Sequence, residues 1–187
     1  MIKYKHIEWM ESKKMDWKSR SAYVFIKTAK GKAEQVWKQF QTWDNVIGSW
    51  IVTGDWDVIV WFDAQDWDTV HRCISTIKSW TEVDQTSSHM VYSGHKTDTW
   101  WWEKPAGAWM LIRENNLDET SEKTKQWNWM TSGASIPGDW DYISWIQGEN
   151  WEDVWNHILQ VKNQDWETST YVPVKSWWNE KWKSQWW

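Results

Sequence analysis

The sequence predicts an α+β fold built from two tandem copies of one βαββαβ module. The tetrapeptide Gly-Asp-Trp-Asp occurs twice, at residues 54–57 and 138–141. When the chain is shifted against itself by 84 residues, ten of the 25 positions from Gly54 to Lys78 are identical. Each copy also shows the same order of strand-like and helix-like patterns, so we interpret the repeat as a duplication.

The first copy begins with a β-branched and aromatic run at 22–28 (AYVFIKT), which is typical of a strand. After Gly31, apolar residues recur at helical spacing from Ala33 to Phe40. The turn at 53–55 is so short that it predicts an antiparallel hairpin, and Asp66 is placed to cap the next helix. We therefore expect strands at 22–28, 46–52, 56–62 and 83–92, and a second helix whose buried face is Trp67, Val70, Ile74 and Ile77.

The second copy repeats this order. We expect its strands at 107–113, 132–136, 140–146 and 166–174, and its helices at 119–130 and 150–162. The helix at 119–130 leaves a shorter connection to the next strand than the first copy has. The order βαββαβ gives a four-stranded antiparallel sheet with both helices on one face, the ferredoxin-like arrangement. The open face of each sheet needs an apolar partner, so we expect the two modules to pack as an intramolecular pseudo-dimer.

Residues outside the two modules form three segments. We expect an N-terminal extension at 1–21, a first domain at 22–92, a linker at 93–106, a second domain at 107–176 and a Trp-rich tail at 177–187. The linker has turn-forming residues and no periodicity, and its Trp100-Trp101-Trp102 run is expected to pack across the junction. The aromatic tail is interpreted as a packing helix rather than a membrane-surface helix.

The composition of the chain argues against several classes of function. With 21 Lys and Arg against 26 Asp and Glu, the net charge of −5 argues against a stand-alone nucleic-acid binder. The single Cys73 excludes an internal disulfide, and a reducing compartment, the cytoplasm, is expected. No apolar run approaches the length that crosses a bilayer, so we expect a soluble protein without membrane contact.

Tryptophan is unusually common, with 25 residues, whereas leucine occurs only at Leu111, Leu117 and Leu159. Many tryptophans stand where a periodic pattern needs a large apolar residue, such as Trp37 in the first copy and Trp155 in the second. A general replacement of leucine by tryptophan explains this better than separate functional roles. We therefore expect most of these indoles to be core residues, and each enlarged site to risk overpacking by about 1–3 kcal/mol.

Several stretches together carry a family resemblance. The first copy has AYVFIKT at 22–28, a helix that follows Gly31, TGDWDVIV at 53–60 and a last strand that holds Thr86. The second copy repeats GDWDYI at 138–143 and closes with TSTYVPV at 168–174. This series resembles the effector-binding domain of the Lrp/AsnC (feast/famine) transcription regulators, also called the RAM domain. The resemblance extends over about 22–92 and 107–176, most of the chain.

The resemblance implies a dimeric α/β-barrel module that binds a small effector, commonly an amino acid, near the Gly-x-aromatic-Asp turn at a subunit interface. Glycine can adopt positive φ and present backbone N–H groups to a carboxylate, and an aspartate can accept from an ammonium group. The other interpretation is that Gly-Asp only makes the hairpin and the aspartates bond their own backbone. The candidate effector-binding residues are Thr53, Gly54, Asp57, Thr86, Gly138, Asp141, Thr168 and Thr170.

The resemblance also bears on partners. A full-length regulator of this family carries a helix-turn-helix domain before the effector module, and residues 1–21 are too few for one, so direct DNA binding is not expected. The expected partners are a small-molecule effector and a second copy of the chain or an Lrp-type paralogue. We expect a non-enzymatic sensing or regulatory module without a cofactor.

Two other functions remain open. Related dimeric α/β barrels include cofactor-free and haem-dependent oxidoreductases. Against an enzyme, the five histidines show no metal-ligand spacing, and His71 and Cys73, two residues apart on a helix, point to different faces. We therefore expect neither a metal site nor a catalytic residue. The third possibility is a structural assembly partner of a DNA-binding paralogue.

Overall fold

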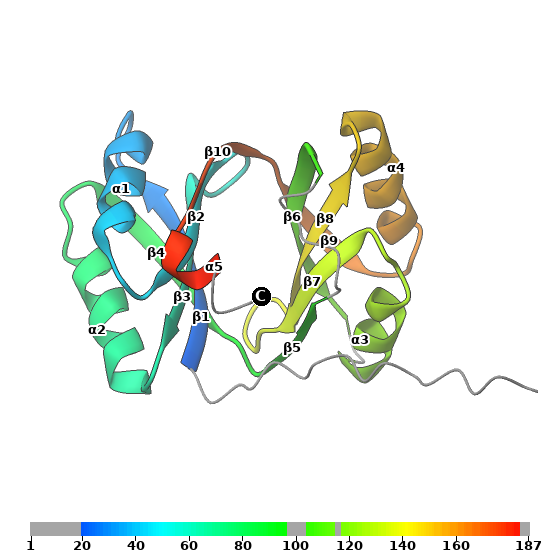
Figure 1. Cartoon of the computed structure of the whole chain (residues 1–187), viewed down its shortest axis with the longest axis horizontal. Coiled ribbons are helices and arrows are strands. Elements are labelled where there is room, and N and C mark those ends of the chain that lie inside the picture. Colours follow the sequence, from blue (N-terminus) through cyan, green and yellow to red (C-terminus); the bar gives the residue numbers. More distant parts are fainter. Residues whose placement is uncertain (1–19, 97–103, 115–116, 184–187) are drawn as a thin grey trace, which may run out of the picture.

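Two antiparallel sheets face each other, and the helices cover their outer faces (Figure 1). The computed structural model describes residues 20–96, 104–114 and 117–183. The first module comprises β1 to β4 with its helices, and the second comprises β6 to β9 with its helices. This arrangement confirms the predicted α+β fold of two ferredoxin-like modules, of the dimeric α/β-barrel type, packed as an intramolecular pseudo-dimer.

The first module follows the expected order closely. Asp66 caps the second helix, since its carboxylate accepts from the Thr69 N–H at 2.7 Å. The strand at 46–52 is found at its expected bounds. The elements are β1 (Arg20–Thr28), α1 (Ala33–Gln39), the short 3₁₀ helix η1 (Phe40–Thr42), β2 (Val46–Val52), β3 (Val58–Ala64), α2 (Trp67–Lys78) and β4 (Val83–Met90).

The second module repeats this architecture. Asn150 caps its second helix through the Asp153 N–H at 3.0 Å, as Asp66 does in the first module. The elements are β6 (Ala106–Arg113), α3 (Leu117–Lys125), β7 (Met130–Ser135), β8 (Tyr142–Gly148), α4 (Trp151–Lys162) and β9 (Glu167–Tyr171).

The connection after α3 differs from expectation. The helix ends at Lys125 and not at Met130, because the N–H groups of Trp127 and Met130 bond the carbonyls of Thr124 and Trp127 in turns. The corresponding turns of the first module are made by Trp43 and Val46. The last two turns before the second strand are therefore the same in both modules, but α3 and β7 are joined by a shorter segment, 126–129, than α1 and β2, which are joined by 40–45 with η1.

Each sheet has five strands because the modules exchange one strand. The strand β5 (Ser93–Lys96) follows the first module but pairs with β7 of the second. The strand β10 (Pro173–Trp178) follows the second module but pairs with β2 of the first. The orders are β10-β2-β3-β1-β4 and β5-β7-β8-β6-β9. The segment expected to be an aperiodic linker thus begins with a strand, and the Trp100-Trp101-Trp102 run lies outside the described residues.

A central cluster fills the space between the two sheets. Its indoles contact one another edge to face, with ring centroids 4.9 Å apart for Trp50 and Trp109 and 5.1 Å apart for Trp109 and Trp145. Tyr23 adds an edge contact to Trp109 at 5.5 Å and stacks on Trp61 at 5.3 Å. Aromatic residues from both modules therefore hold the pseudo-dimer together.

Two further clusters lie under the helices. In the first module, Val36 of α1 and Ile74 of α2 pack on the outer face of the sheet. In the second, Val154 and Ile158 of α4 do the same. Helical spacing of apolar residues explains this burial.

Not every tryptophan is a core residue. Trp37 packs against the outer core of the first module as expected. Trp155 and Trp67 were expected on buried helix faces, but they are 50% and 42% exposed. Trp67 is the first residue of α2, and Trp155 lies beside the buried stripe of α4 rather than on it. For these two positions the core interpretation is wrong.

The tail closes over the first module. Its expected packing helix is the short α5 (Glu180–Lys183), which follows β10. The buried Asn179 side chain donates from Nδ2 to the carbonyls of Trp43, Asp44 and Val46, at 3.5, 3.4 and 3.1 Å. One amide group therefore satisfies several carbonyls of the loop before β2.

We expect Asn179→Ala to lower the free energy of unfolding by about 1–3 kcal/mol, because the buried Val46 carbonyl and the carbonyls of Trp43 and Asp44 each lose one donor. Lys181→Ala is the matched control, since it removes an exposed ion pair with Asp44, worth about 0–1 kcal/mol. Urea unfolding of both variants measures the difference. Equal losses for the two variants would contradict this role of Asn179.

Candidate functional site

The two Gly-Asp-Trp-Asp turns have the same backbone geometry. Gly54 and Gly138 adopt φ of 115° and 148°, a region that side chains rarely allow. In each turn the final aspartate closes the hairpin, because its carbonyl accepts from Val52 N–H at 3.0 Å or from Ile136 N–H at 2.9 Å. Both turns therefore require glycine at this position.

The aspartate side chains hold each turn to the first strand of its own module. The Asp57 carboxylate accepts from the Thr28 N–H at 2.8 Å and from the Thr28 hydroxyl at 3.2 Å, and Lys27 lies 3.5 Å away. The Asp141 carboxylate accepts from the Glu114 N–H at 2.9 Å. Both aspartates thus bond backbone, and each carboxylate still has lone pairs for a further donor.

Each turn lies against the last strand of the other module. A methyl group in place of the Gly54 hydrogen would come within 3.2 Å of the Tyr171 ring, and at Gly138 within 3.4 Å of His89 Nδ1. Thr53 N–H also donates to the Val172 carbonyl at 3.0 Å. The turns therefore lie at the interface between the modules.

The threonines of the last strands are oriented differently. Thr86 pairs with Ile26, Thr168 with Ile112 and Thr170 with Met110. These partners belong to the clusters under the helices, and directly opposed residues share one face of a sheet. The structure therefore does not gather all eight candidate residues in one place, because the threonine side chains of β4 and β9 lie on the helix-covered faces.

An open hollow of about 360 Å³ lies beside the first turn. Trp56 from the turn and Thr86 from β4 both line it, and Lys78 at the end of α2 brings a positive charge. The other lining residues are Val83, Asp84 and Gln85. This hollow brings together the first turn and one of the candidate threonines.

His89 is an interfacial residue that sequence patterns did not single out as a site. It is buried, its Nε2 lies 3.0 Å from the Ser87 hydroxyl, and its ring contacts Phe25 edge to face at 5.4 Å. Burial lowers the pKa of His89, and the nearby Asp139 opposes this only in part. A neutral imidazole therefore packs beneath the second turn.

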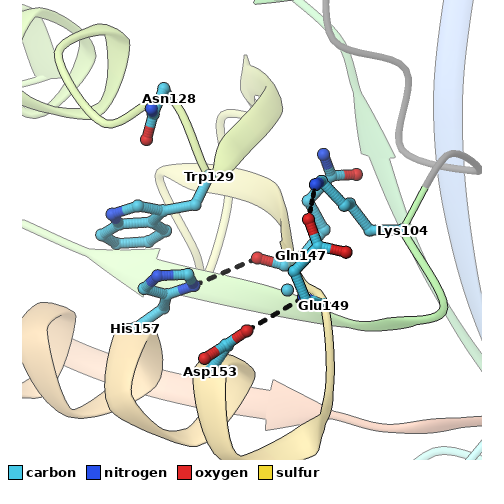
Figure 2. Close-up of a pocket in the computed structure, with 8 residues that line it drawn as sticks. Lys104, Asn128, Trp129, Gln147, Glu149, Asp153 and His157 are labelled. Atoms are coloured by element: carbon cyan, nitrogen blue, oxygen red, sulfur yellow. Dashed lines mark hydrogen bonds and ion pairs between the residues drawn. The ribbon is translucent and has the colours of Figure 1, made fainter.

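A second hollow, of about 400 Å³, lies in the second module at the end of β8 (Figure 2). Figure 2 shows His157 and Trp129 stacked on one side and Gln147 and Lys104 on the other. The ring centroids of Trp129 and His157 are 4.4 Å apart and their planes are nearly parallel, at 3°. The remaining lining residues are Asn128, Gly148, Glu149 and Asp153.

Hydrogen bonds fix the polar side chains of this hollow. His157 Nδ1 lies 3.0 Å from the Gln147 carbonyl, and Glu149 forms an ion pair with Lys104. Asp153 accepts from the Glu149 N–H at 3.1 Å. Burial lowers the pKa of His157, although its bond to Gln147 acts in the opposite direction. The sequence signal for this site was weak, because its residues come from four separate segments.

Within the described ranges, no group of three or more His, Cys, Asp or Glu side chains is arranged to hold a metal ion. The described part of the chain also has no helix that is long and apolar enough to cross a membrane.

We expect the free energy of unfolding to decrease as the pH falls below 6.5, because unfolded His89 binds a proton near its ordinary pKa of 6.5 whereas the folded form resists it. The contribution is complete above that pH and is lost as the pH falls towards the lowered pKa. His89→Gln should flatten this dependence by up to about 1.4 kcal/mol per pH unit.

Urea unfolding at about pH 8 and about pH 5 measures this effect. The control is His71→Gln, at an exposed position on α2, which should keep the dependence of the unchanged protein. If His89→Gln loses as much stability on acidification as the unchanged protein does, His89 is not the responsible group.

Comparison with solved structures supports the two-module fold. The siroheme decarboxylase NirDL is 9% identical, over 84% of this chain and 72% of that chain, with a TM-score of 0.64. Its complex with an iron-uroporphyrin III analogue gives 11% identity over the same shares and a TM-score of 0.59. At these identities the likeness shows the fold alone, and it spans both modules.

A family model matches the sequence of the first module. The model of the Lrp/AsnC ligand binding domain matches residues 21–101. The hypothetical protein PHS023 from Pyrococcus horikoshii is 24% identical over 38% of this chain and 87% of that chain, with a TM-score of 0.37. No curated protein matches the chain. The match covers the first module and the strand β5 that follows it, so this part of the chain is similar to the Lrp/AsnC ligand-binding domain.

Proposed function

We propose that this protein is a non-enzymatic regulatory module that senses a small molecule of the amino-acid class at the interface between its two modules. The observation that carries the proposal is the position of the turns. Each Gly-Asp-Trp-Asp turn contacts the last strand of the opposite module, as Gly54 does with Tyr171. A ligand bound at a turn would therefore contact both modules.

The turns offer groups for both ends of an amino acid. Backbone N–H groups beside the positive-φ glycines suit a carboxylate. The remaining lone pairs of Asp57 and Asp141 suit an ammonium group. Thr53 also bonds Val172 across the interface, so a ligand at this turn would act on a contact that joins the modules.

A regulatory role needs a partner that binds the ligand-bound and the ligand-free protein with different affinities. A ligand shifts a conformational equilibrium only by its difference in affinity for the two states. We propose that this partner is a second copy of the chain or an Lrp-type paralogue. We also propose that the protein makes no direct contact with nucleic acid, in keeping with its net charge of −5. We further propose that the second module is a duplicated domain of the same type.

We expect at least one of the twenty amino acids to raise the thermal midpoint. At a concentration of about 100 times the dissociation constant, binding adds about 2.7 kcal/mol, or about 5–10 °C for a chain of this size. Asp57→Asn and Asp141→Asn should reduce the shift, because asparagine can still accept the backbone bond but lacks the charge that attracts an ammonium group.

Asp66→Asn is the matched control. It also removes one carboxylate charge while keeping an acceptor for its backbone bond, but it lies at the exposed start of α2. This variant should respond to the amino acid as the unchanged protein does. No shift with any amino acid would refute the proposed sensing.

A further inference from the structure

The helix α4 carries a second apolar stripe besides the one that it buries. Its buried stripe, which includes Val154 and Ile158, packs on the sheet of the second module. Trp151, Trp155 and Leu159 follow one another at four-residue spacing, so they lie along one side of the helix. Their side chains are 41%, 50% and 55% exposed. Figure 1 shows α4 on the outer side of the second module, away from the first.

The first module shows that the fold does not require this exposed stripe. The helices α2 and α4 both have 12 residues, and both end on a lysine. At the positions of Trp155 and Leu159, however, α2 has His71 and Ser75, which are exposed. The abundance of tryptophan does not explain the stripe either, because a replacement of leucine by tryptophan leaves a position apolar. The stripe is therefore a property of the residues of the second module.

The stripe forms one continuous surface. The rings of Trp151 and Trp155 have their centroids 6.4 Å apart, and Leu159 follows one turn later. A buried tryptophan covers about 150–250 Å², so three large side chains that are about half exposed present about 300 Å² of mostly apolar surface. Contiguous apolar patches of a few hundred Å² often mark a surface that binds another protein.

The charges beside the stripe are complementary to those of a second, antiparallel copy of the same helix. Glu152 in the first turn and Lys162 in the last are both exposed, and they lie about 15 Å apart along the axis. If two copies pack antiparallel about a two-fold axis level with His157, Glu152 of each lies opposite Lys162 of the other. In the same register Trp155 lies opposite Leu159 of the other copy. Parallel packing would instead place like charges together.

We propose that the exposed stripe of α4 binds a second copy of this chain, through an antiparallel pair of α4 helices related by a two-fold axis. Such an interface uses the same surface on both chains. The inference rests on the proposed function only where that names a second copy as the partner. It does not depend on a ligand at the turns.

The size of the surface sets the expected strength. Two stripes together bury about 600 Å², and with their polar flanks about 1,000 Å², which is at the lower end of specific interfaces. We therefore expect a reversible dimer with a dissociation constant of about 1–100 µM. Sedimentation equilibrium of the full chain without ligand, from about 1 µM to about 1 mM, measures this constant.

Two substitutions test the stripe with residues that the fold already accepts at the corresponding positions of α2. Trp155→His and Leu159→Ser should each weaken the dimer at least about tenfold, because both side chains lie at the centre of the contact. Trp67→His is the matched control. It removes a tryptophan that is 42% exposed at the start of α2, and it should leave the dissociation constant unchanged.

Charge reversal tests the antiparallel register. Glu152→Lys places two positive charges together at each end of the helix pair, and it should weaken the dimer about threefold or more. Adding Lys162→Glu to the same chain should restore the affinity. Adding Lys78→Glu instead, at the corresponding position of α2, gives the same net charge and should not restore it.

The proposal is overturned if the chain stays monomeric at about 1 mM. It is also overturned if a dimer forms but keeps its affinity in Trp155→His and Leu159→Ser, because the two chains then meet at another surface. Thermal unfolding shows whether each variant is folded, and either variant decides alone if the other is not. If Lys162→Glu fails to restore the affinity lost in Glu152→Lys, the antiparallel register is overturned.

The outcome is independent of the sensing proposed for the turns. Sedimentation without ligand reports only on the α4 surface, whereas the thermal midpoint with amino acids reports on the turns. A monomeric chain that amino acids stabilise would overturn this inference alone. A dimer that no amino acid stabilises would refute the sensing and support this inference.

Discussion

The burial of two apolar sheet faces against each other is the interaction on which the rest of the structure depends. A tryptophan buries about 150–250 Å², worth about 4–6 kcal/mol at 25 cal/mol per Å². Trp109 lies in this interface with its indole N–H buried and without an acceptor among the described residues, at a cost of about 1–3 kcal/mol. The apolar gain exceeds this cost. The aromatic centre of the interface is therefore favourable even where an indole N–H has no acceptor, and hydrogen bonds such as that from Thr53 to Val172 join the modules beside it.

The two modules share a backbone fold but have different side chains beside their turns and on their second helices. His89 under one turn corresponds to Tyr171 under the other, and Cys73 corresponds to His157. Pro137 occupies the place of Thr53 and has no N–H to offer across the interface. The two turns therefore offer different hydrogen-bonding groups, so a ligand would not make identical contacts at both.

Much of the fold was predictable because its signals are local. Alternating and helical patterns place β2 and α2, and Asp66 marks the start of α2. The strand β5 was not predictable, since four polar and small residues show no strand pattern and gain their structure from pairing with the other module. The turn glycines were visible in the sequence, whereas the orientation of Thr86 follows only from strand register. The hollow near His157 is assembled from distant segments, so no spacing reveals it.

The exchanged strands β5 and β10 have a consequence for assembly. If β10 leaves its place, the edge of β2 is exposed with unpaired backbone groups, and such an edge accepts another strand readily. The β10 of a second molecule carries the required sequence. Reciprocal exchange between two molecules then closes a domain-swapped dimer, and one-directional exchange builds an open chain of molecules. The strand exchange that joins the two modules of one molecule can therefore also link separate molecules.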